Sequence, residues 1–340
     1  MDDGSCNSGV FYWARLLYFS PQIEVTLVDG EDLRQGGLEG LDLLVVPGGS
    51  SARQCRSMGE SGIESVRKFV KAGGSYVGVC AGFHSALNRE KCIGLLPFRY
   101  LEDARGAAAL LAVDISSRGA ELMGIRPGRY MVRYSRGPIA ESCEPWEYGK
   151  GEVLGVYKSS VGPLGKPGGN FFGAPAVIHG NYGKGKVIAT SFHPESHPVN
   201  HAIALGCIRA VTGVKPVPVF PKKNYRPVRI AFYTPGTIGK APIERMLELE
   251  RHPDLDVRFC AGTELNEGIL EHVDVFIVPD GIDAVNKDLA DTWKEQLMNF
   301  MCKGGKILVS GDEAVSFPSH RNLKVIPAGT SFVEEALARP

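Results

Sequence analysis

The chain contains 340 residues, of which 44% are hydrophobic and 22% are charged, as in a globular protein long enough for two domains. Lys and Arg number 38, and so do Asp and Glu, so no excess of one sign attracts nucleic acid or an anionic membrane. No apolar run reaches the roughly 18 residues that a membrane-spanning helix needs. We therefore expect no nucleic-acid or membrane partner, and the oligomeric state stays open.

Three short apolar runs in the first eighty residues predict buried parallel strands, because both faces of such strands are apolar. The predicted strands are Ile23–Val28, Leu43–Val46 and Ser75–Val79. Between the last two, apolar residues recur at helical spacing over residues 63–72, and a pair of glycines ends this predicted helix. Strands that alternate with helices predict an α/β domain with a doubly wound, mostly parallel, flavodoxin-like sheet.

The rest of the chain predicts a linker and a second domain. Gly180–Lys186 is rich in glycine and predicts a hairpin turn that leads into a strand at Val187–Thr190. Residues 215–227 contain four prolines, which favour an extended connector. We therefore predict a first domain over residues 1–214, a linker over 215–227 and a second domain over 228–340.

The second domain has the pattern of a smaller copy of the first. Two segments align at an offset of 232 residues and a third at 231. The aligned segments are 23–30 with 255–262, 43–47 with 275–279, and 73–79 with 304–310. Gly311 then stands in the place of Cys80, and no His-Pro-Glu triplet follows it. We predict a degenerate α/β repeat that lacks the chemistry of the first domain.

The segment Gly78-Val-Cys80-Ala-Gly82 follows a predicted strand directly and has the pattern G-x-C-x-G. A nucleophile at such a strand–helix turn lies beside the first amides of the next helix, which favour the thiolate. The two glycines leave room where the backbones crowd. The pattern predicts a nucleophile elbow that presents Cys80, and a buried structural cysteine is the alternative.

Downstream, the segment Ser191-Phe-His193-Pro-Glu195 supplies partners for the thiol. Side chains two apart in an extended chain point to the same side, so His193 and Glu195 converge as a base and its orienting carboxylate. A metal site is one alternative, since His193 begins a series of three histidines spaced by four, but prolines interrupt the helix that such a site needs. A histidine that only caps the loop is another.

Another predicted strand ends in Pro47-Gly-Gly49. We expect the backbone N–H groups of Gly49 and Ala81 to form an oxyanion hole, in which each donor contributes about 3 kcal/mol to the transition state. An ordinary strand-end turn is the alternative.

Together these motifs resemble the class I glutamine amidotransferase superfamily, and more narrowly the group related to the N-terminal domain of eukaryotic biotin–protein ligases. The narrower resemblance includes Asp2–Ser5 and Ser135–Pro138, and the whole covers residues 1–212. It implies these roles: nucleophile Cys80, base His193, orienting Glu195, and oxyanion donors Gly49 and Ala81.

Two departures from the family bear on the substrate. Glutamine amidotransferases usually carry Gln two residues after the second elbow glycine, where this chain has His84. No Gly-Arg-Gly-Arg loop for biotinoyl-adenylate occurs, so we expect no biotin ligase activity. Gly48, His84 and Arg136 are weaker candidates for substrate binding. Arg suits a carboxylate, and a solvated surface is the alternative for Arg136.

We predict a thiol-dependent amidohydrolase or acyl transferase that forms an acyl-Cys80 intermediate on a small amide-like or carboxylate substrate, without cofactor or metal. A non-catalytic ligand-binding or regulatory module on the same scaffold is the alternative. A third hypothesis is a redox or aldehyde-adduct role for the thiolate.

The eight cysteines are irregularly spaced and include no C-x-x-C pair, so we expect reduced, mostly buried thiols and a cytoplasmic protein. The first residues do not resemble a signal peptide. At the repeat offset, however, the equivalent of a predicted strand at Val228–Tyr233 precedes Met1, so the natural start of the chain stays open.

Overall fold

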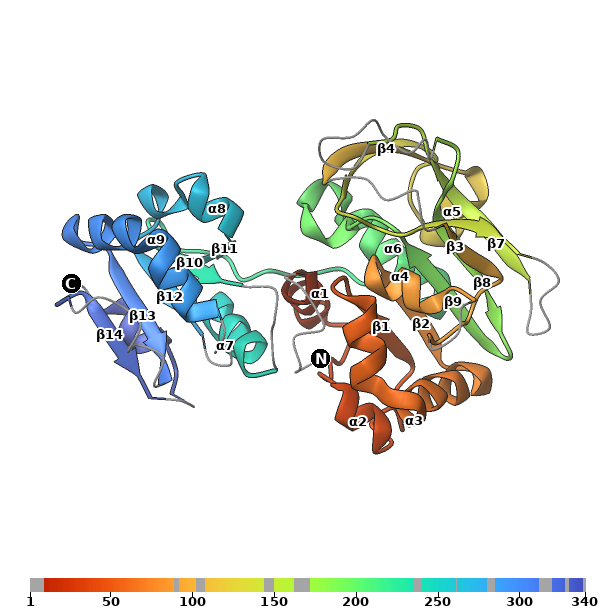
Figure 1. Ribbon diagram of the computed structural model, residues 1–340, viewed down its shortest axis with the longest axis horizontal. Coiled ribbons are helices and arrows are strands. Elements are labelled where there is room, and N and C mark those ends of the chain that lie inside the picture. The colour runs from red at the N-terminus through yellow and green to blue at the C-terminus, as the bar shows by residue number, and fades with distance from the viewer. Residues whose placement is uncertain are drawn as a thin grey trace. The chain divides into compact units, whose positions relative to one another are not determined.

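In the computed structural model the chain divides into two compact units, Asp3–Pro218 and Val219–Pro340 (Figure 1). The boundary between them falls within the proline-rich segment 215–227. The structure describes residues 9–88, 92–101, 108–143, 150–161, 172–234, 240–260, 262–279, 285–311, 320–327 and 330–338. The Asp2–Ser5 segment of the narrower resemblance lies outside these residues.

The first unit is built around a seven-stranded sheet with strand order β1-β2-β9-β8-β7-β4-β5. β1, β2 and β9 pair in parallel, and every other neighbouring pair is antiparallel. The strands are β1 (Leu43–Val46), β2 (Ser75–Val79), β4 (Ala109–Ile115), β5 (Gly128–Tyr134), β7 (Gly151–Tyr157), β8 (Pro175–Tyr182) and β9 (Gly185–Thr190). A two-stranded antiparallel sheet joins β3 (Phe98–Leu101) to β6 (Ile139–Ser142).

The α/β fold predicted from the sequence is confirmed, but parallel pairing is narrower than predicted. It is confined to β1, β2 and β9, because β8 and β9 are joined by a tight hairpin at Gly183, whose φ is 61°, and a hairpin joins antiparallel strands. β7, β4 and β5 continue this antiparallel half of the sheet. The parallel half carries the candidate site at its carboxyl ends.

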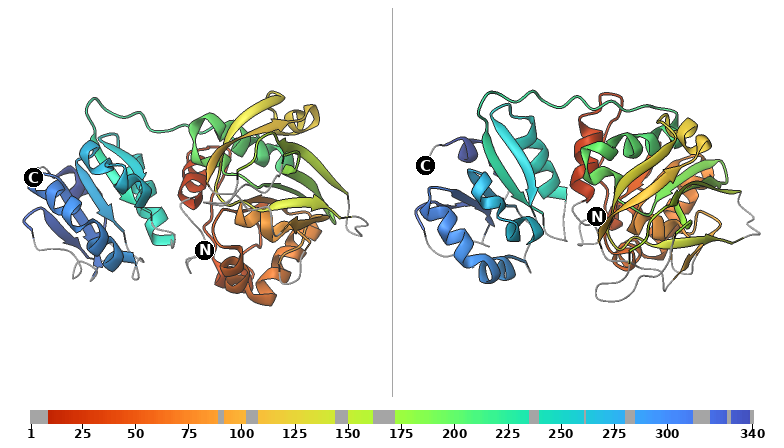
Figure 2. Two further views of the ribbon diagram at one scale, coloured as in Figure 1. Left: turned by 45° about the horizontal axis from the view of Figure 1, so that its top comes forward. Right: turned by 90° about the horizontal axis from the view of Figure 1, so that it is seen from above.

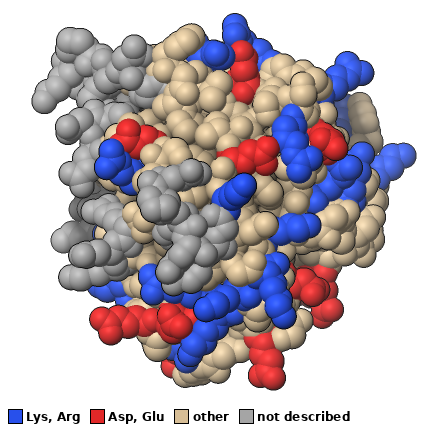
Figure 3. Space-filling view, turned by 90° about the vertical axis from the view of Figure 1, so that its right-hand side faces the viewer, with Lys and Arg blue, Asp and Glu red and all other residues tan. Residues whose placement is uncertain are grey.

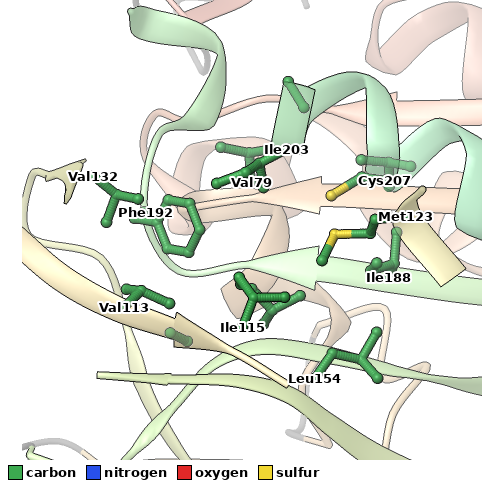
Figure 4. Close-up of a cluster of buried hydrophobic side chains, with 14 of the residues drawn as sticks. Val79, Val113, Ile115, Met123, Val132, Leu154, Ile188, Phe192, Ile203 and Cys207 are labelled. Atoms are coloured by element: carbon green, nitrogen blue, oxygen red, sulfur yellow. The ribbon is translucent and has the colours of Figure 1, made fainter. Parts of the chain in front are cut away.

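Helices cover both faces of the parallel half. α2, α3 and α4 contribute to one apolar cluster, and α1, α5 and α6 contribute to the other. These helices are α1 (Gly9–Tyr18), α2 (Gly30–Arg34), α3 (Ser51–Ala72), α4 (Ala81–Ala86), α5 (Ser117–Met123) and α6 (His201–Thr212). Successive strand residues point to opposite faces, so Val77 and Val79 of β2 join the second of these clusters and Tyr76 joins the first. Figure 4 shows Val79 together with Ile203 and Cys207 of α6.

The helix predicted over residues 63–72 is the second part of α3. The backbone leaves helical geometry at Gly59, whose φ is 62° and ψ is 179°, so α3 is kinked there. The helix ends at Gly73, whose φ is 130°, a backbone conformation that residues other than glycine rarely adopt. The predicted glycine stop is therefore confirmed.

Residues 23–28 form no strand, so this prediction was wrong. A strand requires backbone pairing with a neighbour. In the second unit β11 (Leu255–Cys260), a run of similar pattern, obtains that pairing from β10 (Val228–Tyr233). No described strand of the first unit pairs with residues 23–28. Ile23 and Val25 pack against the apolar cluster that includes α1. The apolar pattern correctly indicated packing but does not report backbone pairing.

The second unit contains an all-parallel five-stranded sheet with strand order β11-β10-β12-β13-β14. Its strands are β10 (Val228–Tyr233), β11 (Leu255–Cys260), β12 (Val275–Val278), β13 (Lys306–Ser310) and β14 (Leu323–Ile326). Its helices are α7 (Lys240–Arg251), α8 (Gly262–Asn266), α9 (Val285–Cys302) and α10 (Val333–Leu337). Before β10, residues 215–227 run without helix or strand, as the two views of Figure 2 show.

The surface of the molecule carries both signs of charge. On the face drawn in Figure 3, Lys and Arg side chains lie among Asp and Glu side chains. Some form ion pairs, as Arg129 does with Asp114 and Arg118 with Glu121. Within the described part of the chain, no helix has both the length and the apolar character needed to cross a bilayer.

Candidate active site

Cys80 occupies a strained corner between β2 and α4. Its φ of 50° and ψ of −99° lie in a region that non-glycine residues rarely adopt. Its backbone is held on both sides, since its N–H donates to the carbonyl of Thr190 at 2.9 Å and its own carbonyl accepts from His84 N at 3.0 Å. Such strain persists only where the surrounding structure fixes it.

The two glycines of the G-x-C-x-G segment make the corner possible. A Cβ on Gly82 would lie 2.1 Å from the carbonyl oxygen of Val46, and a Cβ on Gly78 would lie 2.5 Å from the carbonyl oxygen of Gly82. These oxygens belong to the backbone and have little freedom to move. The hydroxyl of Tyr76 donates to the same Gly82 carbonyl at 2.8 Å, and this hydrogen bond stabilises the turn.

His193 and Glu195 form a buried pair after β9. His193 Nδ1 lies 2.9 Å from Glu195 Oε1, and the Glu195 side chain has no exposed surface. The backbone between them is not extended as predicted, because Pro194–Ser196 forms a short 3-10 turn. The N–H of His193 donates to the carbonyl of Arg133 at 2.9 Å, which ties the turn to β5. The structure thus brings the two side chains together by a tight turn.

The ionisation of His193 depends on both Cys80 and Glu195. Burial lowers the pKa of His193, but the charges of Glu195 and Cys80 and hydrogen bonding to both side chains outweigh burial and raise this pKa to about 10. The remaining ring nitrogen, Nε2, is buried, and no other side chain or backbone group of the described residues makes a well-formed hydrogen bond to it. The arrangement therefore favours an imidazolium beside the sulfur at neutral pH.

The Cys80 side chain is 7% exposed and belongs to the apolar cluster on its side of the sheet. Its Sγ lies 3.8 Å from the carbonyl oxygen of Ser135 as a thiol donor. The hydroxyls of Tyr157 and Ser191 lie 2.8 Å apart and face the same region. Burial raises the pKa of Tyr157, and the nearby Cys80 raises it further.

Sequence analysis gave Ser135, Tyr157 and Ser191 no role at the site. Ser135 lies within the Ser135–Pro138 segment of the resemblance, so a signal was present although it pointed to the family and not to the thiol. Tyr157 ends β7, and no local pattern distinguishes it from a core tyrosine. Ser135 and Tyr157 are brought to the Cys80 region by contacts between distant parts of the chain.

The candidate oxyanion donors lie in segments that follow two neighbouring strands, β1 and β2. Val46 and Gly78 are partners in the parallel register of β1 and β2, so the loop after β1 and the Cys80 corner leave the sheet at the same edge. Gly49 in that loop has a φ of 152°. The N–H of Cys80 itself already donates to the carbonyl of Thr190. The next amide along the chain, at Ala81, is therefore the candidate oxyanion donor of the corner.

The weaker candidates lie in three different settings. His84 is buried in α4 against Tyr100, with ring centroids 4.8 Å apart. Arg136 is exposed with a φ of 53°, one residue after the carbonyl that contacts Cys80. Gly48 lies in the loop after β1. Arg136 thus follows the residue whose carbonyl contacts the thiol, and its side chain reaches solvent.

The histidines that suggested a metal alternative make separate contacts. His197 Nδ1 accepts from the N–H of Val199, and His201 Nε2 lies 3.1 Å from the carbonyl of Glu195. Among the described residues, no group of three or more His, Cys, Asp and Glu side chains is arranged to hold a metal ion. The ring of His193 is oriented by Glu195, whereas His197 and His201 make other contacts.

Comparison with known proteins places the chain. The family described as biotin-protein ligase, N terminal, matches residues 11–91. Pyridoxal 5'-phosphate synthase subunit PdxT of Koribacter versatilis is 31% identical over 173 residues, which cover 48% of this chain and 71% of that protein. Phosphoribosylformylglycinamidine synthase subunit PurQ of Rhodopseudomonas palustris is 31% identical over 174 residues, covering 47% of this chain and 72% of its own.

A biotin–protein ligase of Schizosaccharomyces pombe is also similar, with 27% identity over 170 residues that cover 45% of this chain and 25% of the ligase. The chain therefore belongs to the class I glutamine amidotransferase-like superfamily, in the group similar to the N-terminal part of biotin–protein ligases.

Proposed function

We propose that the first unit is a thiol-dependent amidohydrolase or acyl transferase that works through an acyl-Cys80 intermediate. The observation that carries the proposal is the meeting of two features: a cysteine held at φ 50° after β2, and a buried His193–Glu195 pair in which interactions with Glu195 and with that cysteine raise the pKa of His193 despite its burial. Strain at a corner is stored where a side chain has to be presented. An imidazolium beside a sulfur favours the thiolate, which is the nucleophilic form.

In the proposed mechanism the Cys80 thiolate attacks the carbonyl carbon of the substrate, and the carbonyl oxygen takes the negative charge. N–H groups of Gly49 and Ala81 are the proposed donors to that oxygen. The imidazolium of His193 gives its proton to the leaving amine as the C–N bond breaks, and acyl-Cys80 remains. A water or an acceptor amine then loses a proton to His193, attacks the acyl carbon and releases the thiolate.

The fully buried Glu195 carboxylate orients the imidazole in this scheme. Its Oε1 bonds Nδ1, so Nε2 is left to exchange the proton with the thiol and the leaving group.

The substrate that we propose is a small amide-like or carboxylate compound. The relatives are named as synthase subunits, and the family resemblance implies an amide donor. His84 stands where glutamine amidotransferases usually carry Gln, so the proposal does not name glutamine. Gly48 and Arg136 are proposed to contact the substrate, Arg136 through a carboxylate. We assign no biotin ligase activity and no cofactor to the chain.

The proposal extends to the organisation of the chain. The first unit would carry the Cys-His-Glu triad, and the second would be a degenerate repeat that supports it or binds a partner. Gly311, which follows β13 with a φ of 69°, supports this view because glycine there has no nucleophilic side chain. A cytoplasmic location is part of the same proposal and rests on the cysteine usage of the sequence.

A non-catalytic ligand-binding module is the second candidate, and one observation favours it. Cys80 is only 7% exposed, and its thiol is within hydrogen-bonding distance of the Ser135 carbonyl, as expected of a structural cysteine. In that case the thiol would contribute to packing, and acyl donors would leave it unmodified.

An acylation experiment tests the proposal. The full chain is mixed at neutral pH with p-nitrophenyl acetate and, separately, with a panel of small primary amides that includes glutamine. Release of nitrophenolate and of ammonia is followed, and acyl adducts are mapped by mass spectrometry after acid quenching. We expect an adduct on Cys80, and the Cys302→Ser variant, which alters an exposed cysteine, should acylate like the wild type.

His193→Gln should slow acylation roughly 100-fold, since a positioned general acid–base group contributes about 10²–10⁴-fold. If the activated ester acetylates Cys302 while Cys80 stays unmodified, and no amide releases ammonia, the enzyme proposal fails and the binding-module candidate is favoured.

A further inference from the structure

Apart from Cys80, two cysteines of the first unit lie close to each other. Sγ of Cys55, in α3, is 3.8 Å from Sγ of Cys92, in the segment between α4 and β3. Both residues are thiols in the structure. They are 37 positions apart in the sequence, so their proximity results from the fold. Two sulfurs in van der Waals contact need only a small approach to reach the roughly 2 Å of a disulfide bond.

The segment that carries Cys92 is held firmly against α3 and α4. The guanidinium of Arg67, also in α3, donates to the carbonyl of Ile93 at 2.7 Å and to that of Cys92 at 2.9 Å. Gly94 N donates to the carbonyl of Ser85 in α4 at 3.0 Å. Three contacts therefore fix the backbone on which Cys92 stands, and the two sulfurs are positioned and not merely near.

The two thiols differ in access. Cys55 is half-buried, whereas Cys92 is 6% exposed. The more exposed thiol can meet a small oxidant first, and the buried one lies where it can attack the product. Such an arrangement is typical of an attacking and a resolving cysteine. Cys207 provides a contrast, because burial and the charge of Glu195 raise the pKa of its thiol to about 12.

The pair is also connected to the elbow. Burial raises the pKa of Tyr76, and charge interactions with Cys55 and Cys92 raise it further. The Tyr76 hydroxyl donates to the Gly82 carbonyl, which is the carbonyl that crowds Gly78 at the Cys80 corner. The two cysteines thus interact electrostatically with the tyrosine whose hydroxyl supports the elbow turn.

We propose that Cys55 and Cys92 are a redox-active pair that closes to a reversible disulfide in the presence of a low-molecular-weight disulfide such as oxidised glutathione. The Cys55 thiolate attacks one sulfur of glutathione disulfide, and one glutathione thiolate leaves. The Cys92 thiolate then attacks the Cys55 sulfur of this mixed disulfide, and the second glutathione leaves. The protein loses two electrons and two protons, and glutathione disulfide becomes two glutathione molecules.

The proposed bond would tie α3 to the chain just before β3. The closed loop contains β2, Cys80 and α4, so the bond would restrict the unfolded chain and stabilise the first unit. It would leave Cys80 reduced, because the Cys55 and Cys92 sulfurs lie in contact with each other. The proposal is therefore independent of acylation at Cys80 and stands if that chemistry fails.

Peptide mapping of the full chain tests the proposal. The reduced protein is incubated with oxidised glutathione, remaining thiols are alkylated, and the digest is compared with and without reductant. We expect a peptide linked through Cys55 and Cys92 whose mass is lower by two hydrogen atoms than the sum of its parts. Dithiothreitol should separate the parts, and the melting temperature of the oxidised protein should be higher than that of the reduced protein.

Cys55→Ser and Cys92→Ser should each abolish the linked peptide and the rise in melting temperature, whereas Cys302→Ser, at an exposed cysteine, should retain both. The wild-type map decides the question even if one variant folds poorly. The proposal is overturned if excess oxidised glutathione modifies Cys302 while Cys55 and Cys92 are both recovered as alkylated thiols, or if either sulfur is found linked to Cys80.

Discussion

The corner after β2 and the corner after β13 both have a positive φ but are occupied by different residues. Cys80 follows β2 with a φ of 50°, and Gly311 follows β13 with a φ of 69°. Glycine adopts a positive φ without strain, whereas cysteine at such φ and ψ costs about 1–3 kcal/mol. The chain therefore accepts strain at one corner and avoids it at the other, which points to a use for the Cys80 side chain.

The surroundings of the two corners differ in the same direction. Near Cys80, the positions where Gly78 and Gly82 would carry a Cβ are occupied by backbone oxygens. At Gly311, no atom of the described residues lies within 4 Å of such a Cβ. The first corner is a crowded assembly in which each residue is constrained by others, whereas no described residue crowds the second.

The largest effect is expected at Gly82. In Gly82→Ala the new Cβ would meet the Val46 carbonyl at 2.1 Å, and the backbone of β1 or of α4 has to shift. We expect a loss of about 3 kcal/mol in the free energy of unfolding, at the upper end for overpacking, because the obstacle is main chain. Urea unfolding measures it, and a loss below about 1 kcal/mol would show that the corner is not crowded.

The second effect is the pH dependence that His193 confers. Because the pKa of His193 is raised from 6.5 to about 10, its contribution to stability is complete below pH 6.5 and is lost as the pH rises to about 10. We expect the wild type to lose roughly 2 kcal/mol or more over this range relative to His193→Gln. Unfolding by urea at a series of pH values measures the difference.

His179 provides the matched control for that series. Burial lowers the pKa of His179, so its contribution is lost as the pH falls and not as it rises. His179→Gln should keep the alkaline loss of the wild type. Equal alkaline losses in the wild type and His193→Gln would contradict the coupling of His193 to Glu195 and Cys80.

The third effect is an inversion of the usual order of alanine and glycine. Cys80→Gly removes the strain of the positive φ and Cys80→Ala keeps it, so glycine should be the more stable by about 1–2 kcal/mol. At Cys207, inside α6, alanine should instead exceed glycine by about 1 kcal/mol. Unfolding midpoints of the four variants test this, and the same order at both positions would show that the Cys80 corner is unstrained.

The smallest effect is expected at Gly311, the corner after β13. Gly311→Ala meets no described atom within 4 Å, so only the positive φ opposes it, at about 1 kcal/mol. Thermal unfolding should show a small decrease in melting temperature. A loss as large as that of Gly82→Ala would mean that the two corners are equally constrained, and the contrast between them would no longer hold.

Local patterns in the sequence predicted the elements that present Cys80. β2 is apolar on both faces and ends in a glycine-flanked cysteine, so its strand, its end and its turn could all be identified. The helix stop at Gly73 was equally local. Ile23–Val28 shows the limit of this reasoning, because an apolar run is compatible with packing against a helix when no neighbouring strand pairs with it.

The surroundings of the thiol could not be predicted in the same way. The Ser135 carbonyl reaches Cys80 across 55 positions of sequence, and Tyr157 approaches from β7 in the antiparallel half of the sheet. The spacing of His193 and Glu195 indicated that they could meet, but the 3-10 turn that joins them depends on contacts with β5. Long-range packing leaves no periodic signal in the chain.

The central claim is that His193 activates Cys80 as a nucleophile, and the alkylation rate of Cys80 at pH 7 tests this most directly. Iodoacetamide labelling is followed by mass spectrometry, with the exposed Cys302 of the same molecule as the internal reference. We predict that Cys80 reacts faster than Cys302, and that His193→Gln slows only Cys80, by tenfold or more. Labelling of Cys302 with Cys80 left unmodified, or an unchanged Cys80 rate in His193→Gln, would contradict the account.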